Sequence, residues 1–181
     1  MLSAAPGAKQ LAAPLLLPQP LPCPPAAACS ISLHAKFGAY YRTRVPKAGR
    51  DLAYCPFSAE LLVAASAPEV YRLNLSEGRF LAPLASRSPA VNACGISPSH
   101  GLLACAGEDG ALECFDLRQR DALGRLDASA AAGARGQPLT ALRFDDSGMH
   151  LAVGTGNGLV AIFDLRSQVG AGGGGCCWLA G

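Results

Sequence analysis

Short apolar runs separated by turn-forming residues cover the chain from about residue 31 to residue 167. The clearest of these runs are Val91–Ser97, Leu102–Ala106 and Ala111–Asp116. The segment between the last two contains Glu108-Asp109-Gly110, and an Asp-Gly pair favours the positive φ of a tight hairpin turn. Because no segment keeps the 3.6-residue apolar period of a helix, the pattern predicts an all-β fold of consecutive antiparallel strands.

The strand pattern is repeated along the chain. Residues Val91–Arg118 align without a gap on Leu139–Arg166, at an offset of 48 residues, and nine of the 28 aligned positions are identical, including the tetrapeptide Phe-Asp-Leu-Arg. Four equivalent dipeptides, spaced by 40, 42 and 48 residues, mark the repeats: Leu33-His34, Leu73-Asn74, Phe115-Asp116 and Phe163-Asp164. A repeat of about 40–45 residues is typical of WD-type propeller blades.

The repeat predicts a WD40-type β-propeller fragment of about three and a half four-stranded blades, with low-complexity termini. Blades are expected to begin near Arg50, Val91 and Leu139. Ahead of them, Ile31–His34 and Tyr40–Val45 are expected to be the last two strands of another blade. Propellers avoid open sheet edges by closing a ring of typically four to eight blades. The isolated product is therefore expected to expose sheet edges, which favour aggregation.

Each residue of the tetrapeptide has a predicted role. The aromatic residue is expected to pack between neighbouring blades, burying on the order of 150–250 Å². The Asp is expected to accept backbone N–H bonds in the turn that follows. The structural positions of this kind are Leu73, Asn74, Phe115, Asp116, Phe163 and Asp164. Arg118 and Arg166 are expected at the rim, where a guanidinium can pair with a carboxylate or a partner.

Composition limits the folded part of the chain. The length of 181 residues suits one domain, but residues 1–30 hold seven of the fourteen prolines, and residues 168–181 are Gly-rich. We therefore expect a Pro/Ala-rich disordered leader at 1–30, a partial WD-repeat propeller at 31–167 and a Gly-rich tail at 168–181. The prolines argue against a signal peptide, and no apolar run reaches the ~20 residues that span a bilayer, so no membrane association is expected.

The sequence lacks the residue patterns of a catalytic or metal site. Eight cysteines are present without a CxxC pair, and the three histidines are isolated, with no accompanying acidic neighbour motif. The Gly clusters lack the GK[ST] context of a phosphate loop. We therefore expect no enzymatic activity, cofactor, metal or small-molecule substrate, and we interpret the cysteines as buried thiols in a reducing compartment.

Charge is informative only locally, because the formal net charge is +2. No acidic residue precedes Asp51, whereas basic and aromatic residues are interleaved between residues 36 and 50. This composition suits contact with RNA phosphates and stacking on bases. The candidate RNA or partner contacts are Lys36, Tyr40, Tyr41, Arg42, Arg44, Lys47 and Arg50. The alternative is a solvated strand and loop whose tyrosines pack in the blade.

Two longer segments carry a family resemblance. Gly38–Asp51 and Glu69–Leu84, the second of which contains the string EVYRLNL followed by Gly-Arg, closely resemble the nucleolar protein 10 family of WD-repeat proteins. Shorter segments at Val91–Cys94, His100–Leu102 and Leu159–Arg166 continue the match in order, so that it covers about 31–167.

The resemblance implies a non-enzymatic scaffold of the small-subunit processome that acts in nucleolar pre-rRNA processing and 40S ribosome assembly. It also implies processome proteins and precursor rRNA as partners, the nucleolus as location, and further blades on both sides together with a charged helical C-terminal extension in family members.

Two alternatives stay open at this point. The tetrapeptide fits the aromatic-Asp-x-Arg box of propeller substrate receptors in cullin-RING ubiquitin ligases, in which the Arg meets the adaptor; Arg118 and Arg166 would then contact that adaptor. The chain could also be a generic protein-interaction propeller or an inactive fragment.

Overall fold

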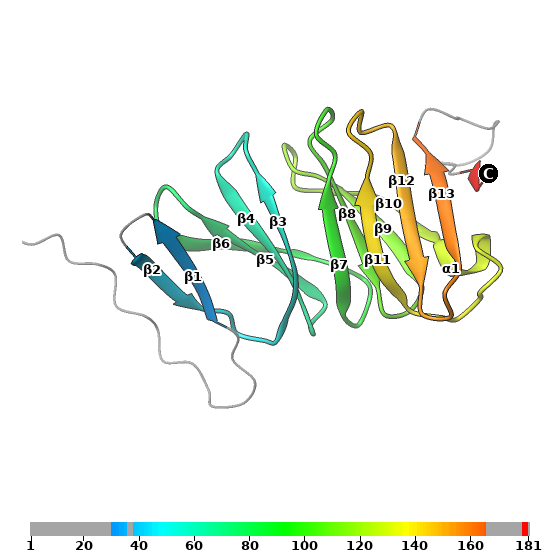
Figure 1. Cartoon of the computed structure of the whole chain (residues 1–181), viewed down its shortest axis with the longest axis horizontal. Coiled ribbons are helices and arrows are strands. Elements are labelled where there is room, and N and C mark those ends of the chain that lie inside the picture. The colour runs from blue at the N-terminus through cyan, green and yellow to red at the C-terminus, as the bar shows by residue number, and fades with distance from the viewer. Residues whose placement is uncertain (1–29, 36–37, 166–178, 181) are drawn as a thin grey trace, which may run out of the picture.

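The structure is a computed structural model that describes residues 30–35, 38–165 and 179–180, with side chains described at 30–32 and 42–165. The described residues form four antiparallel sheets and one short helix (Figure 1). The predicted all-β class is therefore confirmed, as is the arrangement of three and a half sheets. No described helix has the length and apolar character needed to cross a membrane.

The first sheet has two strands, β1 (Ser30–Ala35) and β2 (Gly38–Arg44). The second sheet contains β3 (Gly49–Cys55), β4 (Glu60–Ala65), β5 (Glu69–Asn74) and β6 (Arg79–Ala85). The third contains β7 (Val91–Ile96), β8 (Leu102–Gly107), β9 (Ala111–Asp116) and β10 (Ala122–Asp127). The fourth contains β11 (Leu139–Phe144), β12 (His150–Thr155), β13 (Val160–Asp164) and β14 (Leu179–Ala180). Neighbours in each sheet follow chain order.

The sheets stand face to face, with an apolar core in each space between them. Phe115 of the third sheet is buried together with Leu62 and Leu84 of the second sheet. In the next space, Phe163 of the fourth sheet is buried together with Leu112 of the third. Consecutive residues of β9 are therefore buried on both faces. Full burial of an apolar side chain of this size contributes about 1.5–3 kcal/mol.

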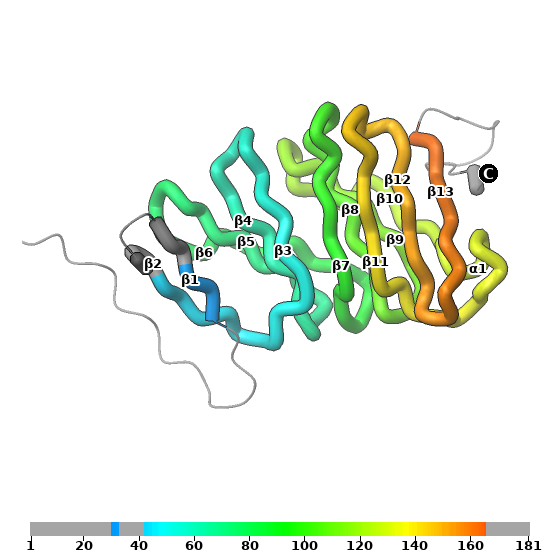
Figure 2. The backbone as a smooth tube through the Cα atoms, in the orientation of Figure 1, coloured from blue at the N-terminus to red at the C-terminus, as the bar shows by residue number. Residues whose placement is uncertain are grey.

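The first strands of the three larger sheets, β3, β7 and β11, lie side by side (Figure 2). The approach of β11 to β7 leaves little room at Gly95, where an added Cβ would lie 2.6 Å from Cδ2 of Leu142. Sheets that radiate from adjacent first strands are the arrangement of propeller blades, and we call β3, β7 and β11 the inner strands.

Turns between strands gather at two edges of the molecule (Figure 1). The upper edge carries the β3–β4, β7–β8, β9–β10 and β11–β12 turns. The lower edge carries the β2–β3 loop and the β4–β5, β8–β9 and β12–β13 turns. Because successive strands are antiparallel, a residue that precedes an inner strand and a residue that follows a third strand lie at opposite edges.

Two elements differ from the sequence-based expectation. Helix α1 (Ala128–Ala131) follows β10, and its first turn is capped by Asp127, whose carboxylate accepts a hydrogen bond from the backbone N–H of Ala130. The short strand β14 pairs with Phe163 and Asp164 of β13, although residues 168–181 were expected to form only a tail. A helix of four residues and a strand of two residues are each too short to show a recognisable apolar pattern in the sequence. The rest of the predicted leader and tail lies outside the described residues.

Candidate functional site

The structural positions of the repeat lie at the ends of third strands. Phe115, Phe163 and Leu73 are buried. Asp116 accepts a hydrogen bond of 2.8 Å from the backbone N–H of Arg118. Asn74 occupies the equivalent position in the second sheet.

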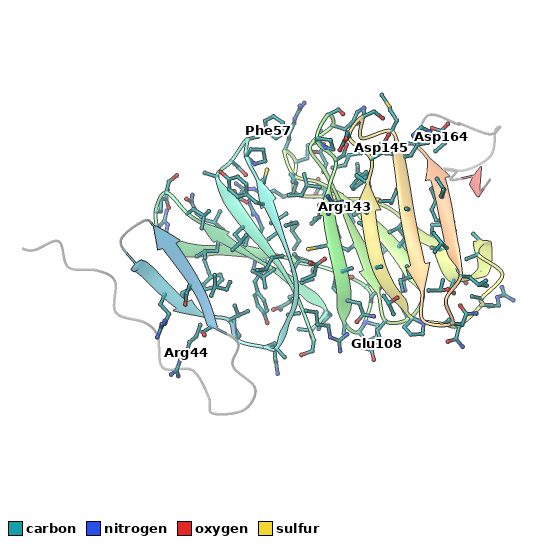
Figure 3. The ribbon with its side chains drawn as sticks, in the orientation of Figure 1. Arg44, Phe57, Glu108, Arg143, Asp145 and Asp164 are labelled. Carbon is teal, nitrogen blue, oxygen red and sulfur yellow. The ribbon has the colours of Figure 1, made fainter. Side chains whose placement is uncertain are left out.

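The Asn74 side-chain oxygen accepts hydrogen bonds from the backbone N–H groups of Ser76, at 2.8 Å, and Glu77, at 3.1 Å. Asp164 lies at the upper edge, at the end of β13 (Figure 3). In the second and third sheets these side chains fix the exit of the strand, as Asx turns do.

Of the two arginines expected at the rim, only Arg118 is among the residues that the structure describes. Arg118 is exposed in the turn between β9 and β10, at the upper edge. Arg166 lies outside the described residues. The basic stretch is at the opposite edge, so the structure does not bring Arg118 together with it.

The basic stretch follows β2 into the loop before β3. Arg42, Arg44 and Lys47 are exposed, and Arg44 projects away from the sheet near the lower edge (Figure 3). The Arg42 guanidinium donates to the Ser32 hydroxyl at 3.3 Å. Within the described part of the chain, none of these three cations is paired with a carboxylate. Lys36 and the side chains of Tyr40 and Tyr41 lie outside what the structure describes.

Arg50 differs from the other basic residues because its guanidinium is bound by residues of the neighbouring third sheet. It donates to the amide oxygen of Asn92 and lies 3.1 Å from the carboxylate of Glu108. The amide nitrogen of Asn92 in turn donates to the backbone carbonyl of Leu139 at 2.7 Å. This line of hydrogen bonds joins β3, β7 and β11, so Arg50 is engaged within the fold. Sequence reasoning missed this role because the partners are 42 and 58 residues away.

A groove of about 550 Å³, which the sequence did not reveal, lies along the inner strands. Leu52 and Tyr54 of β3 line it and are 53% and 54% exposed. The carboxylate of Asp51 lies along it too, and is held in place by the backbone N–H groups of Leu52, at 2.8 Å, and Cys94, at 2.9 Å.

The remaining residues that line the groove come mainly from β7, β11 and the turns that follow them: Cys94, Gly95, Ile96, Pro98, Leu142, Arg143, Phe144, Asp145 and Asp146.

The upper end of the groove holds a fixed negative charge. The carboxylate of Asp145 accepts hydrogen bonds from the Ser147 hydroxyl, at 2.5 Å, and from the backbone N–H of His150, at 2.9 Å. These donors lower the pKa of Asp145 below its ordinary value. Asp145 therefore remains ionised throughout the physiological pH range.

His150 is not isolated, contrary to the expectation from the sequence. Nδ1 of His150 lies 3.2 Å from the carboxylate of Asp145, so this histidine does have an acidic neighbour. The turn between β11 and β12 reverses the chain and brings the two residues together. The spacing Asp-Asp-Ser-Gly-Met-His, in which the hydroxyl of Ser147 contacts the same carboxylate, is the signal that could have indicated it.

The described cysteines are thiols buried in the cores: Cys55, Cys94, Cys105 and Cys114. Burial, with a smaller contribution from the charge of Asp51, raises the pKa of the Cys94 thiol to about 12. A thiol with this pKa is protonated at neutral pH and is a poor nucleophile. Among the residues that the structure describes, no three His, Cys, Asp or Glu side chains are grouped to hold a metal ion.

Comparison with known proteins extends the resemblance. Residues 27–171 match the family model described as nucleolar protein 10-like, N-terminal domain. Nucleolar protein 10 of Xenopus laevis and that of Homo sapiens are each 41% identical over 144 residues, which are 76% of this chain and 21% of the relative.

A more distant relative, the Ribosome biogenesis protein ENP2 of Saccharomyces cerevisiae, is 39% identical over 139 residues, 77% of this chain and 20% of the relative. The chain thus spans about a fifth of the length of these relatives. Their names denote nucleolar and ribosome-biogenesis proteins rather than enzymes. Since the family model covers every strand described above except β14, the chain belongs to the nucleolar protein 10-like family of β-propellers.

Proposed function

We propose that the chain is a non-enzymatic propeller scaffold that acts in the nucleolus, in ribosome biogenesis. In finer detail, we propose that it works within the small-subunit processome, in pre-rRNA processing and 40S assembly, with processome proteins and precursor rRNA as partners. The observation that carries the proposal is the match to relatives named nucleolar protein 10 and ribosome biogenesis protein.

The proposal includes a division of the chain. A leader at 1–30 and a tail at 168–181 flank a propeller part at 31–167, and the match of the family model to 27–171 supports the propeller part as the folded unit.

RNA contact is proposed at the lower edge. Arg42, Arg44 and Lys47 offer three exposed positive charges within six residues, and the described structure pairs none of them with a carboxylate. Cations that no internal carboxylate neutralises can neutralise RNA phosphates, and the release of counterions from the RNA makes binding favourable and dependent on salt. Arg50 is less available because Asn92 and Glu108 hold it.

The test is binding of a labelled single-stranded RNA oligonucleotide to the purified chain, titrated at several KCl concentrations. The triple variant Arg42→Ala, Arg44→Ala, Lys47→Ala is expected to bind more weakly. Each lost phosphate contact should reduce the slope of log K against log salt by about 0.7. Arg118→Ala with Arg120→Ala, which removes two positive charges at the upper edge, is the control for a general loss of positive charge. Binding unchanged by the triple substitution would refute RNA contact at this edge.

A ubiquitin-ligase substrate receptor remains the rival function. It relies on Arg118, which is exposed at the upper edge as an adaptor contact would require. Co-purification with a ligase adaptor, lost on Arg118→Ala, would favour that rival over the ribosome-biogenesis function.

A further inference from the structure

The groove along the inner strands presents apolar side chains to solvent. Leu52 and Tyr54 project from the same face of β3, and each is more than half exposed. Phe57, in the following turn at the upper edge, is 71% exposed (Figure 3). Three large exposed apolar residues in succession along one strand and its turn are typical of a contact surface.

The charge of the groove selects the kind of partner. Its described lining contains three carboxylates, those of Asp51, Asp145 and Asp146, and a single cation, Arg143. The hydrogen-bond donors around Asp51 and Asp145 hold these two carboxylates in place. Phosphate groups are repelled by such a surface, whereas lysine and arginine side chains are attracted to it.

Aromatic side chains add to the preference for cations. Tyr54 and Phe144 both line the groove, and the face of an aromatic ring attracts an ammonium or guanidinium group. The volume of about 550 Å³ lies within the range of about 300–1,000 Å³ that is usual for ligand sites. Residues of three adjacent strands line the groove, so that a bound segment can contact all three.

We propose that this groove binds an extended cationic peptide segment of a protein partner. Apolar side chains of the segment lie against Leu52 and Tyr54, and its lysine or arginine side chains reach the carboxylates of Asp145 and Asp146. The site is separate from the proposed RNA contacts at the lower edge, so the scaffold would hold RNA and a basic protein segment at different surfaces.

The test uses fluorescence anisotropy with the full chain and a labelled nine-residue peptide in which Lys and Arg alternate with Leu and Gly. The peptide is expected to bind, and Asp146→Lys is expected to weaken binding by about tenfold because it replaces attraction with repulsion. Arg143→Glu is expected to tighten binding several-fold. Leu123→Ser, which changes an exposed apolar residue on β10 outside the groove, should have no effect.

Opposite outcomes would overturn the proposal. Equal binding of a peptide with Glu in place of Lys and Arg would show that charge does not select the ligand. Peptide affinity unchanged by both Asp146→Lys and Arg143→Glu would place binding elsewhere. Displacement of the peptide by an oligouridine RNA, with RNA binding lost on Arg143→Glu, would identify the groove as an RNA site. The triple lower-edge variant should bind the peptide normally, so failure of this proposal and failure of the RNA proposal are distinguishable.

Discussion

Arg72 and Glu60 form a bidentate ion pair on the face of the second sheet that packs against the third. Nη2 of Arg72 lies 2.7 Å from one carboxylate oxygen and 2.9 Å from the other, and Nε donates at 2.9 Å. The two residues are only 2% and 7% exposed. Arg72 thereby fills a position that Cys114 occupies in the next repeat, where the core is apolar.

The ion pair gives a prediction about stability. Arg72→Met should destabilise the chain by about 3–5 kcal/mol because it leaves the carboxylate of Glu60 buried without its partner. The double variant Arg72→Met, Glu60→Met should recover most of that loss, since it buries no charge. Urea unfolding measures both free energies. A double variant as unstable as the single one would contradict this account.

Two glycines with positive φ provide a matched test of close packing. Gly110 has φ +81°, and an added Cβ would lie 2.6 Å from the backbone carbonyl oxygen of Gln137. Gly133 has φ +75° with no atom within 4 Å of the same position. Gly133→Ala should cost only the strain of the left-handed conformation, about 1–2 kcal/mol.

At Gly110 the strain and a clash with backbone act together. Gly110→Ala should therefore cost about 1–3 kcal/mol more than Gly133→Ala. The urea midpoints of the two variants give the comparison. Equal losses at both sites would show that the packing of the β8–β9 turn against Gln137 is unimportant.

The turn between β11 and β12 should respond to acid. The hydroxyl of Ser147 and the backbone N–H of His150 lower the pKa of Asp145, so the folded state binds the proton less tightly than the unfolded chain. The stabilisation is then complete above the ordinary carboxyl pKa of about 4 and is lost as the pH falls towards the folded value.

Urea midpoints of Asp145→Ala and the parent chain should accordingly differ most at pH 7 and converge as the pH falls below about 4. Asp146→Ala, which changes the adjacent exposed carboxylate, is the control and should resemble the parent chain at neutral pH. A difference for Asp145→Ala that stays constant down to pH 2 would exclude the carboxylate as its source.

The face of β13 that points away from the third sheet is apolar and exposed, so we expect the chain to self-associate through it. Val160 and Ile162 are exposed there, while the residues that the repeat places at the same positions in β9, Leu112 and Cys114, are buried against the next sheet. Val160→Thr with Ile162→Thr should raise the concentration at which the chain remains monomeric in analytical ultracentrifugation. Unchanged association would assign it to another surface.

The repeat was readable from the sequence because each blade keeps its own local strand and turn chemistry. The positions of Phe115 and Asp116, for example, follow from an alignment of the chain with itself. The groove and the Arg50–Glu108 pair were not readable, because they join residues of different blades that no local period relates. The sequence alone does not distinguish Arg50 from Arg42. In the structure Arg50 joins the second sheet to the third, whereas Arg42 is exposed and contacts Ser32 of its own sheet.

Recovery of precursor rRNA from cells tests the central claim most directly. The chain should be tagged, purified after crosslinking and compared with the variant carrying Arg42→Ala, Arg44→Ala and Lys47→Ala. The account predicts that precursor rRNA and processome proteins accompany the parent chain, with less rRNA on the variant. Recovery of a ubiquitin-ligase adaptor without precursor rRNA would contradict it.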